Sequence, residues 1–305
     1  MTHPADSHGG GFRGAMTALV TPFLQSGEVD ERALHCLADW QVECGIRGLV
    51  PCGTTGEGAT LTADECRRVI HTVVEASAGR VPVIAGCGSN DTRRTVEAAR
   101  IAVEAGAHAL LVVTPYYNKP NRSGMRAHFR AVAEAAGVPL LAYNVPGRTG
   151  QNIGSEGVLE LAEIPGVAGV KEASGNLEQI ATILAGMPKG FVVFSGDDAL
   201  ALPALALGAH GLISVLSNEA PHEIAMLVDR ALAGDYLGAR EVHFRLLPLM
   251  KANFIESNPV PVKTALAILG RCREDVRAPL GPPEASTRQA VADALARAGL
   301  LEPAR

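Results

Sequence analysis

The chain has 305 residues, a mass of 31.7 kDa and a formal net charge of −5 that is spread along its length. This mild charge and the lack of basic clusters give no reason to expect a nucleic-acid or membrane partner, and no apolar run is long enough to span a bilayer. The composition is 47% hydrophobic but only 4% aromatic, with 33 glycines, which predicts aliphatic strands and alanine-rich helices joined by tight turns. Small molecules are therefore the expected partners.

The six cysteines fall at irregular intervals, with no Cys-x-x-Cys pair and no clustered histidines. We expect no metal and no cofactor, and we interpret the cysteines as reduced thiols of a cytoplasmic protein. Residues 1–11 are polar and glycine-rich, so they are neither a secretion signal nor a membrane anchor. We expect them to form a loose leader.

Short apolar runs alternate with alanine-rich helical segments from Ala15 onward, for roughly the eight cycles that a closed barrel needs. The predicted strands are residues 16–23, 48–52, 81–86, 109–114, 139–145, 167–171, 191–195 and 211–215. The intervening helices have recognisable starts. Asp30 and Asp91 precede helices 31–43 and 92–105, Thr62 and Glu65 form a capping-box pattern, and Pro221 occupies the first turn of helix 221–233.

A doubly wound open sheet would alternate in the same way, but two features favour a closed barrel. Polar and glycine-rich motifs follow strands along the whole chain, and no Gly-x-Gly-x-x-Gly turn follows the first strand. The fold class is therefore α/β, a (β/α)8 TIM barrel over residues 12–233. Residues 234–305, with predicted helices 238–252, 262–269 and 285–298, form a C-terminal helical extension.

Lys171 ends the apolar strand 167–171, where a charged side chain is unexpected. An ammonium held in apolar surroundings loses hydration, so its pKa falls and the amine can attack a ketone or aldehyde to form a Schiff base. The alternative is a lysine whose stem lines the strand while its head reaches solvent. Partners at other strand ends would favour the catalytic interpretation.

Candidate partners follow several strands. The turn from Gly53 to Gly58 offers the hydroxyls of Thr54 and Thr55 and several backbone N–H groups, which can bind a carboxylate, although it could also be a flexible loop. Tyr116 and Tyr117, two of only four tyrosines, follow the fourth strand and suit either proton transfer or a subunit contact.

After the fifth strand, Tyr143 is expected to point into the barrel mouth beside Lys171, and Arg148 carries a guanidinium suited to a substrate carboxylate. After the seventh strand, Asp197 and Asp198 are predicted to cap the next helix rather than to catalyse. The segment Gly211-Leu212-Ile213-Ser214 can supply backbone groups to the same mouth. All these candidates lie at carboxyl ends of strands, as a barrel active site requires.

The ordered motifs Gly53-Thr54-Thr55-Gly56-Glu57, Tyr116-Tyr117-Asn118, Tyr143-Asn144-Val145-Pro146-Gly147-Arg148-Thr149 and Gly169-Val170-Lys171-Glu172 resemble the N-acetylneuraminate lyase/dihydrodipicolinate synthase superfamily. The likeness extends over nearly the full chain and is closest to the dihydrodipicolinate synthases. It implies a (β/α)8 barrel with a helical C-terminal extension, assembled as a homotetramer of two tight dimers.

The resemblance implies that pyruvate condenses with Lys171 and that the resulting enamine attacks L-aspartate 4-semialdehyde, on the route to diaminopimelate and lysine. Thr54, Tyr143 and Tyr117 match the proton relay of the family, with Tyr117 reaching across the dimer interface. Four further residues match substrate contacts: Thr55, Gly196 and Ile213 for the pyruvate end, and Arg148 for the carboxylate of the semialdehyde.

One departure concerns regulation. Lysine-inhibited members of the family typically carry a histidine and an acid in the pocket at the dimer interface, where this chain has Cys66 and Arg94, whereas Asn90 and Tyr116 fit the pattern. An arginine facing the ammonium of lysine is unfavourable. We therefore hypothesise weak or absent inhibition by lysine.

Two other functions are compatible with parts of this pattern. Another pyruvate-dependent aldolase, acting on a 2-keto-3-deoxy sugar acid or on 4-hydroxy-2-oxoglutarate, would keep Lys171 but change the acceptor pocket, and Arg148 argues for an acceptor with a nearby carboxylate. A non-catalytic metabolite-binding barrel would be expected to lose the lysine or the relay phenols, and all are present.

Overall fold

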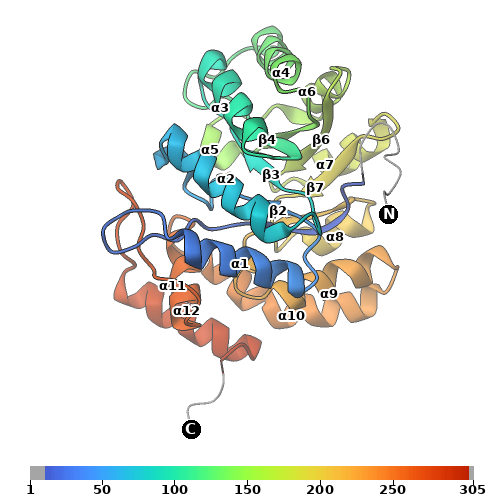
Figure 1. Cartoon of the computed structure of the whole chain (residues 1–305). Helices are drawn as coiled ribbons and strands as arrows, with labels where there is room; N and C mark the ends of the chain where they lie inside the picture. The colour runs from blue at the N-terminus through green and yellow to red at the C-terminus, as the bar shows by residue number, and fades with distance from the viewer. Residues whose placement is uncertain (1–10, 302–305) are drawn as a thin grey trace.

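The structure is a computed structural model that describes residues 11–301 (Figure 1). Eight parallel strands form one sheet in the order β2-β1-β8-β7-β6-β5-β4-β3, so strands that are neighbours in sequence are also neighbours in space. The strands are β1 Gly14–Ala18, β2 Leu49–Val50, β3 Ile84–Gly86, β4 Ala109–Val113, β5 Leu140–Asn144, β6 Val167–Glu172, β7 Val192–Ser195 and β8 Gly211–Ser214. This sequential order excludes the doubly wound alternative, whose strand order reverses at a switch point.

The two edge strands of this sheet meet and close the barrel. Leu49 bridges Val83 in parallel, its N–H donates to the carbonyl of Pro82 at 3.0 Å, and the N–H of Gly86 donates to the carbonyl of Pro51 at 2.9 Å. Closure satisfies the backbone groups that an open edge would expose. The predicted (β/α)8 barrel is therefore confirmed.

Helices follow the strands around the outside of the barrel (Figure 1). They are α1 Glu31–Glu43, α2 Ala63–Ser77, α3 Thr92–Glu104, α4 Arg122–Ala136, α5 Pro146–Thr149, α6 Gly154–Ala162, α7 Leu177–Gly186, α8 Ala201–Ala206 and α9 Pro221–Leu232, with 3-10 turns η1 Gly58–Thr60 and η2 Leu216–Asn218. The predicted helix starts are confirmed. Asp30 and Asp91 accept N-terminal N–H groups, and Thr62 with Glu65 forms a reciprocal capping box.

The first strand is shorter than predicted, because the chain leaves the sheet after Ala18. The N–H of Val20 donates to the side chain of Asn218 at 3.0 Å instead of to a neighbouring strand, and Phe23 pairs with Val29 in an antiparallel bridge. Apolar residues therefore continue past the end of the strand, and hydrophobicity alone does not mark where pairing stops.

Side chains that point into the barrel form a core separate from the layer between strands and helices. The inner core includes Met16, Leu141, Tyr143, Phe194 and Ile213. On β6 the interior position two residues before Lys171 is Gly169, where a Cβ atom would lie 2.5 Å from Val192. The absence of a side chain at Gly169 lets neighbouring interior residues pack tightly below the barrel mouth.

The C-terminal helices α10 Tyr236–Ala252, α11 Val260–Ile268 and α12 Ala285–Ala298 pack on one side of the barrel, next to α1 (Figure 1). Val262 and Leu266 of α11 form a small apolar cluster with Leu37 of α1. Residues 1–10, most of the expected leader, lie outside the described residues. Every helix within residues 11–301 is too short or too polar to cross a membrane.

Candidate active site

Lys171 and Tyr143 meet at the carboxyl ends of β6 and β5. They are register partners in the parallel ladder, and the Nζ atom of Lys171 lies 4.4 Å from the centroid of the Tyr143 ring. Lys171 is only 4% exposed and Tyr143 only 7%. The structure thus brings together the amine and the phenol that the sequence predicted.

Gly196, at the end of β7, makes room for the lysine stem. A Cβ atom at this position would lie 3.0 Å from Cε and 3.1 Å from Cγ of Lys171, so any larger residue would press on the amine. The N–H of Gly196 donates to the carbonyl of Glu172 at 2.8 Å, which fixes the strand end. Ile213 on the next strand is fully buried in the inner core.

The threonine turn, Gly53 to Gly58 after β2, is held by residues from distant parts of the chain. Thr55 is 2% exposed, and its Oγ1 accepts a hydrogen bond from Nδ2 of Asn258 at 2.9 Å. The Thr21 hydroxyl donates to the carbonyl of Gly56 at 2.7 Å. A turn anchored at buried groups is not the flexible loop that the sequence left as an alternative.

Asn258 also contacts Arg148, so it links the two candidate substrate contacts. The Nη2 atom of Arg148 donates to the carbonyl of Asn258 at 3.2 Å, while the amide of Asn258 donates to Thr55. Oδ1 of Asn258 is buried and has no hydrogen-bond partner among residues 11–301. Asn258 was not among the predicted site residues, although its place before Pro259 and Pro261 marks a turn in the sequence.

Glu57, in the same turn, forms an ion pair with Lys263 of α11 that is sealed from solvent. The Nζ to Oε1 distance is 2.5 Å, and the side chains are 2% and 0% exposed. Burial lowers the pKa of Lys263, while Glu57 acts in the opposite direction. The other Glu57 oxygen accepts the backbone N–H of Arg277 at 2.9 Å. Sequence reasoning missed this pair, because nothing local relates residues so far apart.

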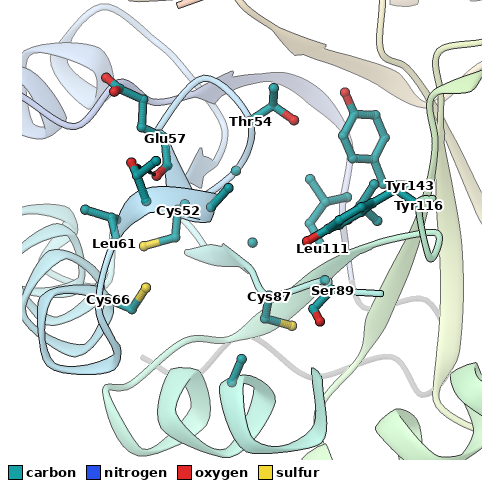
Figure 2. Close-up of a pocket in the computed structure, with 18 of the residues that line it drawn as sticks. Cys52, Thr54, Glu57, Leu61, Cys66, Cys87, Ser89, Leu111, Tyr116 and Tyr143 are labelled. Atoms are coloured by element: carbon teal, nitrogen blue, oxygen red, sulfur yellow. Dashed lines mark hydrogen bonds between the residues drawn. The ribbon is translucent and has the colours of Figure 1, made fainter. Parts of the chain in front are cut away.

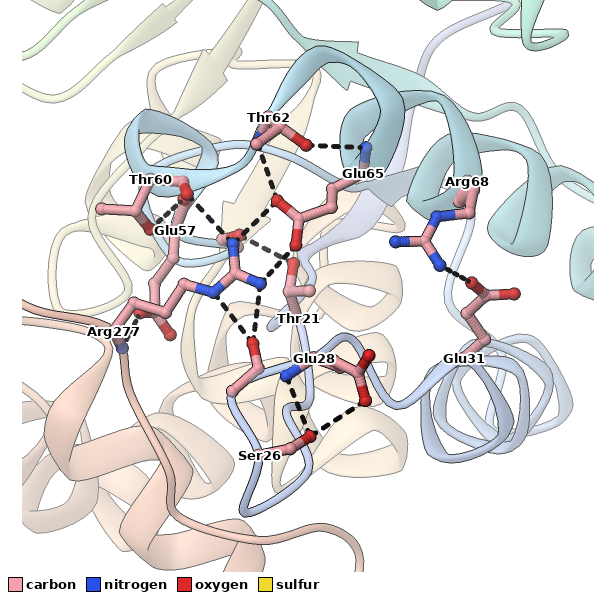
Figure 3. Close-up of polar contacts among 12 residues, drawn as sticks. Thr21, Ser26, Glu28, Glu31, Glu57, Thr60, Thr62, Glu65, Arg68 and Arg277 are labelled. Atoms are coloured by element: carbon pink, nitrogen blue, oxygen red, sulfur yellow. Dashed lines mark hydrogen bonds and ion pairs between the residues drawn. The ribbon is translucent and has the colours of Figure 1, made fainter.

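Arg277 extends this connection to α2 (Figure 3). Its guanidinium bonds the Glu65 carboxylate, the carbonyl of Gly27 at 2.7 Å and the carbonyl of Thr60 at 3.0 Å. The hydrogen bond from Arg277 lowers the pKa of Glu65 to about 2, against the effect of burial. The C-terminal extension therefore holds the threonine turn in place through Lys263 and Arg277.

A second polar network fixes the outer faces of β5 and β6. The Glu172 carboxylate accepts Nδ2 of Asn144 at 2.9 Å, Nε2 of Gln179 at 3.1 Å and the N–H of Ser174 at 2.8 Å. Because successive strand residues point to opposite faces, this network outside the barrel sets the positions of Tyr143 and Lys171 inside it.

The predicted capping of the helix after β7 is wrong for both aspartates. Helix α8 has no side-chain cap. Asp198 is buried and reaches across to the next strand end, where it accepts the Ser214 hydroxyl and the N–H groups of Val215 at 3.0 Å and Leu216 at 3.2 Å. Burial raises the pKa of Asp198, and those three donors partly offset the effect. The Asp197 carboxylate accepts the N–H of Ala199 at 2.9 Å, within its own turn.

Tyr117 is the one predicted relay residue that is largely exposed to solvent. It is 87% exposed and has a φ of 71°, in the left-handed region, and Tyr116 is 37% exposed. Nδ2 of the following Asn118 donates to the carbonyl of Asn90 at 2.8 Å, which anchors the loop. An exposed aromatic ring on a constrained loop suits a contact with another molecule.

One cavity of about 780 Å³ connects the barrel mouth with the space between α2 and α3. Thr54, Tyr143 and Arg148 line its mouth side, together with Asn258 of the C-terminal extension. Its other walls include all four residues that the sequence analysis assigned to a regulatory pocket: Cys66, Asn90, Arg94 and Tyr116. Figure 2 shows Tyr116 beside Tyr143, with Thr54 and the cysteines on other walls.

A closed (β/α)8 barrel with a buried lysine and an adjacent phenol at its mouth defines the class of Schiff-base-forming barrel enzymes. The chain belongs to the dihydrodipicolinate synthetase family, whose sequence model matches residues 11–298.

Individual relatives agree with the family over almost the whole chain. A protein of Maridesulfovibrio salexigens named 4-hydroxy-tetrahydrodipicolinate synthase is 49% identical over 291 residues, covering 95% of this chain and 99% of its own. The dihydrodipicolinate synthase of Acinetobacter baumannii, described as complexed with pyruvate, superposes with a TM-score of 0.93 at 39% identity, covering 95% and 99%. The Cyanidioschyzon merolae enzyme, described with lysine bound, gives 0.92 at 43% identity, with the same coverage.

Proposed function

We propose that the protein is a 4-hydroxy-tetrahydrodipicolinate synthase, which condenses pyruvate with L-aspartate 4-semialdehyde on the route to diaminopimelate and lysine. The observation that carries the proposal is the buried Nζ of Lys171 beside the ring of Tyr143. Relatives about half identical over the full length, such as the Maridesulfovibrio protein, bear the same name.

The chemistry begins with the neutral amine of Lys171, which attacks C2 of pyruvate. A carbinolamine forms and loses water to give an iminium ion, which is an electron sink for the adjacent carbon. Removal of a C3 proton gives the enamine, and its C3 then attacks the aldehyde carbon of the semialdehyde. Tyr143 and Thr54 line the cavity, and the Tyr143 ring lies beside the amine, so they are suited to move these protons.

Two groups of contacts would position the substrates. Thr55, together with the backbone at Gly196 and Ile213, would hold the pyruvate end of the site. Arg148 lies at the rim of the cavity, where its planar guanidinium can bind the carboxylate of the semialdehyde in a bidentate manner.

The proposal extends to assembly. We place Tyr117 in the relay of a neighbouring copy, because within one chain it is 87% exposed. A homotetramer of two such dimers would complete each site. Residues 12–233 would form the catalytic barrel and residues 234–305 an extension folded together with it, as the pair of Glu57 and Lys263 supports. The cytoplasm, where thiols stay reduced, suits the six cysteines.

The decisive experiment is reductive trapping. The protein is incubated with pyruvate and borohydride, and the adduct is located by mass spectrometry, with Lys171 the expected site. Lys171→Ala should abolish trapping, whereas the exposed-lysine control Lys189→Ala should not. Aspartate semialdehyde is then compared with keto-sugar acids as partners. An adduct on another side chain, or turnover only with a sugar acid, would contradict the proposal.

A further inference from the structure

Three cysteines converge on the wall of the catalytic cavity. Cys52 follows β2, Cys66 lies in the first turns of α2 and Cys87 follows β3, and all three line the cavity. Figure 2 shows the sulfur atoms of Cys52 and Cys66 pointing toward one another, whereas the sulfur of Cys87 points away from both. Neither the reaction nor substrate binding uses these thiols.

The two facing thiols have unequal chemistry. Interaction with the facing Cys52 thiol lowers the pKa of Cys66, against the effects of burial and of the nearby Glu65 carboxylate. The same interaction, with burial, raises the pKa of Cys52 well above its usual value. Burial raises the pKa of Cys87 to about 12, so that thiol stays protonated. Cys66 is therefore the nucleophile of the group.

Cys52 is held in place by its backbone. It has a φ of 57°, in the left-handed region. Its carbonyl oxygen packs so closely on two glycines that a Cβ atom would lie 2.1 Å away at Gly58 and 2.5 Å away at Gly86. Cys52 therefore cannot shift without moving the turn that carries Thr54 and Thr55.

We propose that Cys66 and Cys52 form an oxidisable thiol pair in the cavity wall, modified by small hydroperoxides. The Cys66 thiolate attacks one oxygen of hydrogen peroxide, the O–O bond breaks, and the departing hydroxide takes a proton to become water. This leaves Cys66 as a sulfenic acid. The Cys52 sulfur then attacks the Cys66 sulfur, an S–S bond forms and a second water leaves, so two thiols are oxidised and one peroxide is reduced.

The disulfide would pull the start of α2 toward the end of β2. Because Cys52 is held tightly against two glycines, this movement would strain the intervening turn and shift Thr54 and Thr55, the residues to which the proposed function gives proton transfer and pyruvate binding. Turnover would then fall, and a thiol reductant would restore it by reopening the bond.

Peptide mapping tests the pair directly. Cys52 and Cys66 lie on one tryptic peptide, residues 48–67, and Cys87 lies on another, residues 81–93. After treatment with hydrogen peroxide and alkylation, the first peptide should carry two fewer alkyl groups, and dithiothreitol should restore both. The proposal would be overturned if only other cysteines lost alkylation after peroxide treatment, or if Cys66 became linked to Cys87.

Kinetics give a second measurement. Cys66→Ser should keep its basal turnover and be inactivated by peroxide about tenfold more slowly than the parent protein. Cys36→Ser, which removes an exposed thiol on α1, should be inactivated at the parental rate. Inactivation of Cys66→Ser at the parental rate would also overturn the proposal. The kinetic arm rests on the proposed synthase activity, but the mapping arm does not, so the two failures are distinguishable.

Discussion

The Nζ atom of Lys171 lies 4.4 Å from the centroid of the Tyr143 ring, because the two residues are register partners on adjacent parallel strands. In the proposed mechanism the phenol hydroxyl exchanges protons with groups bound to the amine. Tyr143→Phe keeps the ring and its packing but removes that hydroxyl.

Tyr143→Phe should reduce kcat about 100-fold while pyruvate trapping on Lys171 persists. The measurement is steady-state kinetics together with borohydride trapping. Tyr236→Phe, at a tyrosine that is 42% exposed on α10, should leave both unchanged. Normal turnover by Tyr143→Phe would show that the phenol is not part of the proton relay.

Arg148→Ala should chiefly impair use of the second substrate. A hydrogen-bonded contact to a charged group contributes roughly 1.5–3 kcal/mol, so kcat/KM for aspartate semialdehyde should fall about 10- to 100-fold. The KM for pyruvate should be unchanged. The control is Arg122→Ala, which removes an exposed arginine paired with Glu156 and Glu160. If Arg148→Ala left semialdehyde turnover intact, the assignment of the acceptor would lose its main support.

Lys263→Met should destabilise the fold by about 3–5 kcal/mol, because it leaves the buried Glu57 carboxylate without a counter-charge. Combining it with Glu57→Gln should recover part of the loss. Urea unfolding at fixed protein concentration measures both effects. Asp64→Asn breaks the exposed pair with Arg67 and should cost about 0–1 kcal/mol. Purely additive effects of the Glu57 and Lys263 changes would mean that the pair is not coupled.

His128 should make the protein less stable in mild acid. It is 4% exposed, and burial lowers its pKa from 6.5 to about 4. Between these values the unfolded chain binds a proton that the native state does not, so stability falls as the pH falls. The contribution from pH 7 to pH 5 is roughly 2 kcal/mol.

His128→Gln, which is neutral throughout, should therefore lose about 2 kcal/mol less than the parent protein over that range. Urea unfolding at pH 7 and pH 5 provides the comparison. His71→Gln, at a histidine whose side chain is 63% exposed, should follow the parent protein. Parallel losses in all three proteins would assign the acid sensitivity to other groups.

L-Lysine should inhibit weakly or not at all. Its ammonium would be stabilised by an acidic side chain, but the cavity has the guanidinium of Arg94 and the thiol of Cys66 at the two positions that depart from the pattern of lysine-inhibited relatives. Arg94→Glu should tighten inhibition about tenfold, which corresponds to 1.4 kcal/mol. The matched control is Arg93→Glu, which makes the same charge change on a side chain that is 94% exposed. Sub-millimolar inhibition of the parent protein by L-lysine would refute this expectation.

Local patterns allowed much of the fold to be predicted. The helix starts at Asp30, Thr62 and Asp91 were correct, because capping depends on residues within one turn. Strand ends were less accurate. Residues 20–23 continue the apolar run of β1 but leave the sheet, since the backbone partner of Val20 is the side chain of Asn218.

The sequence alone determined the barrel, the buried lysine at a strand end and the phenol one strand away. The alternation of strands and helices and the order of the motifs can be recognised along the chain, and in a parallel barrel the carboxyl ends of all strands then lie at the same mouth. The tertiary structure alone decided that Asn258, Lys263 and Arg277 hold the threonine turn, that Asp198 crosses to the next strand, and that Cys52 faces Cys66. Those contacts join residues 14 to 220 positions apart and depend on how helices close over the barrel, which no local pattern encodes.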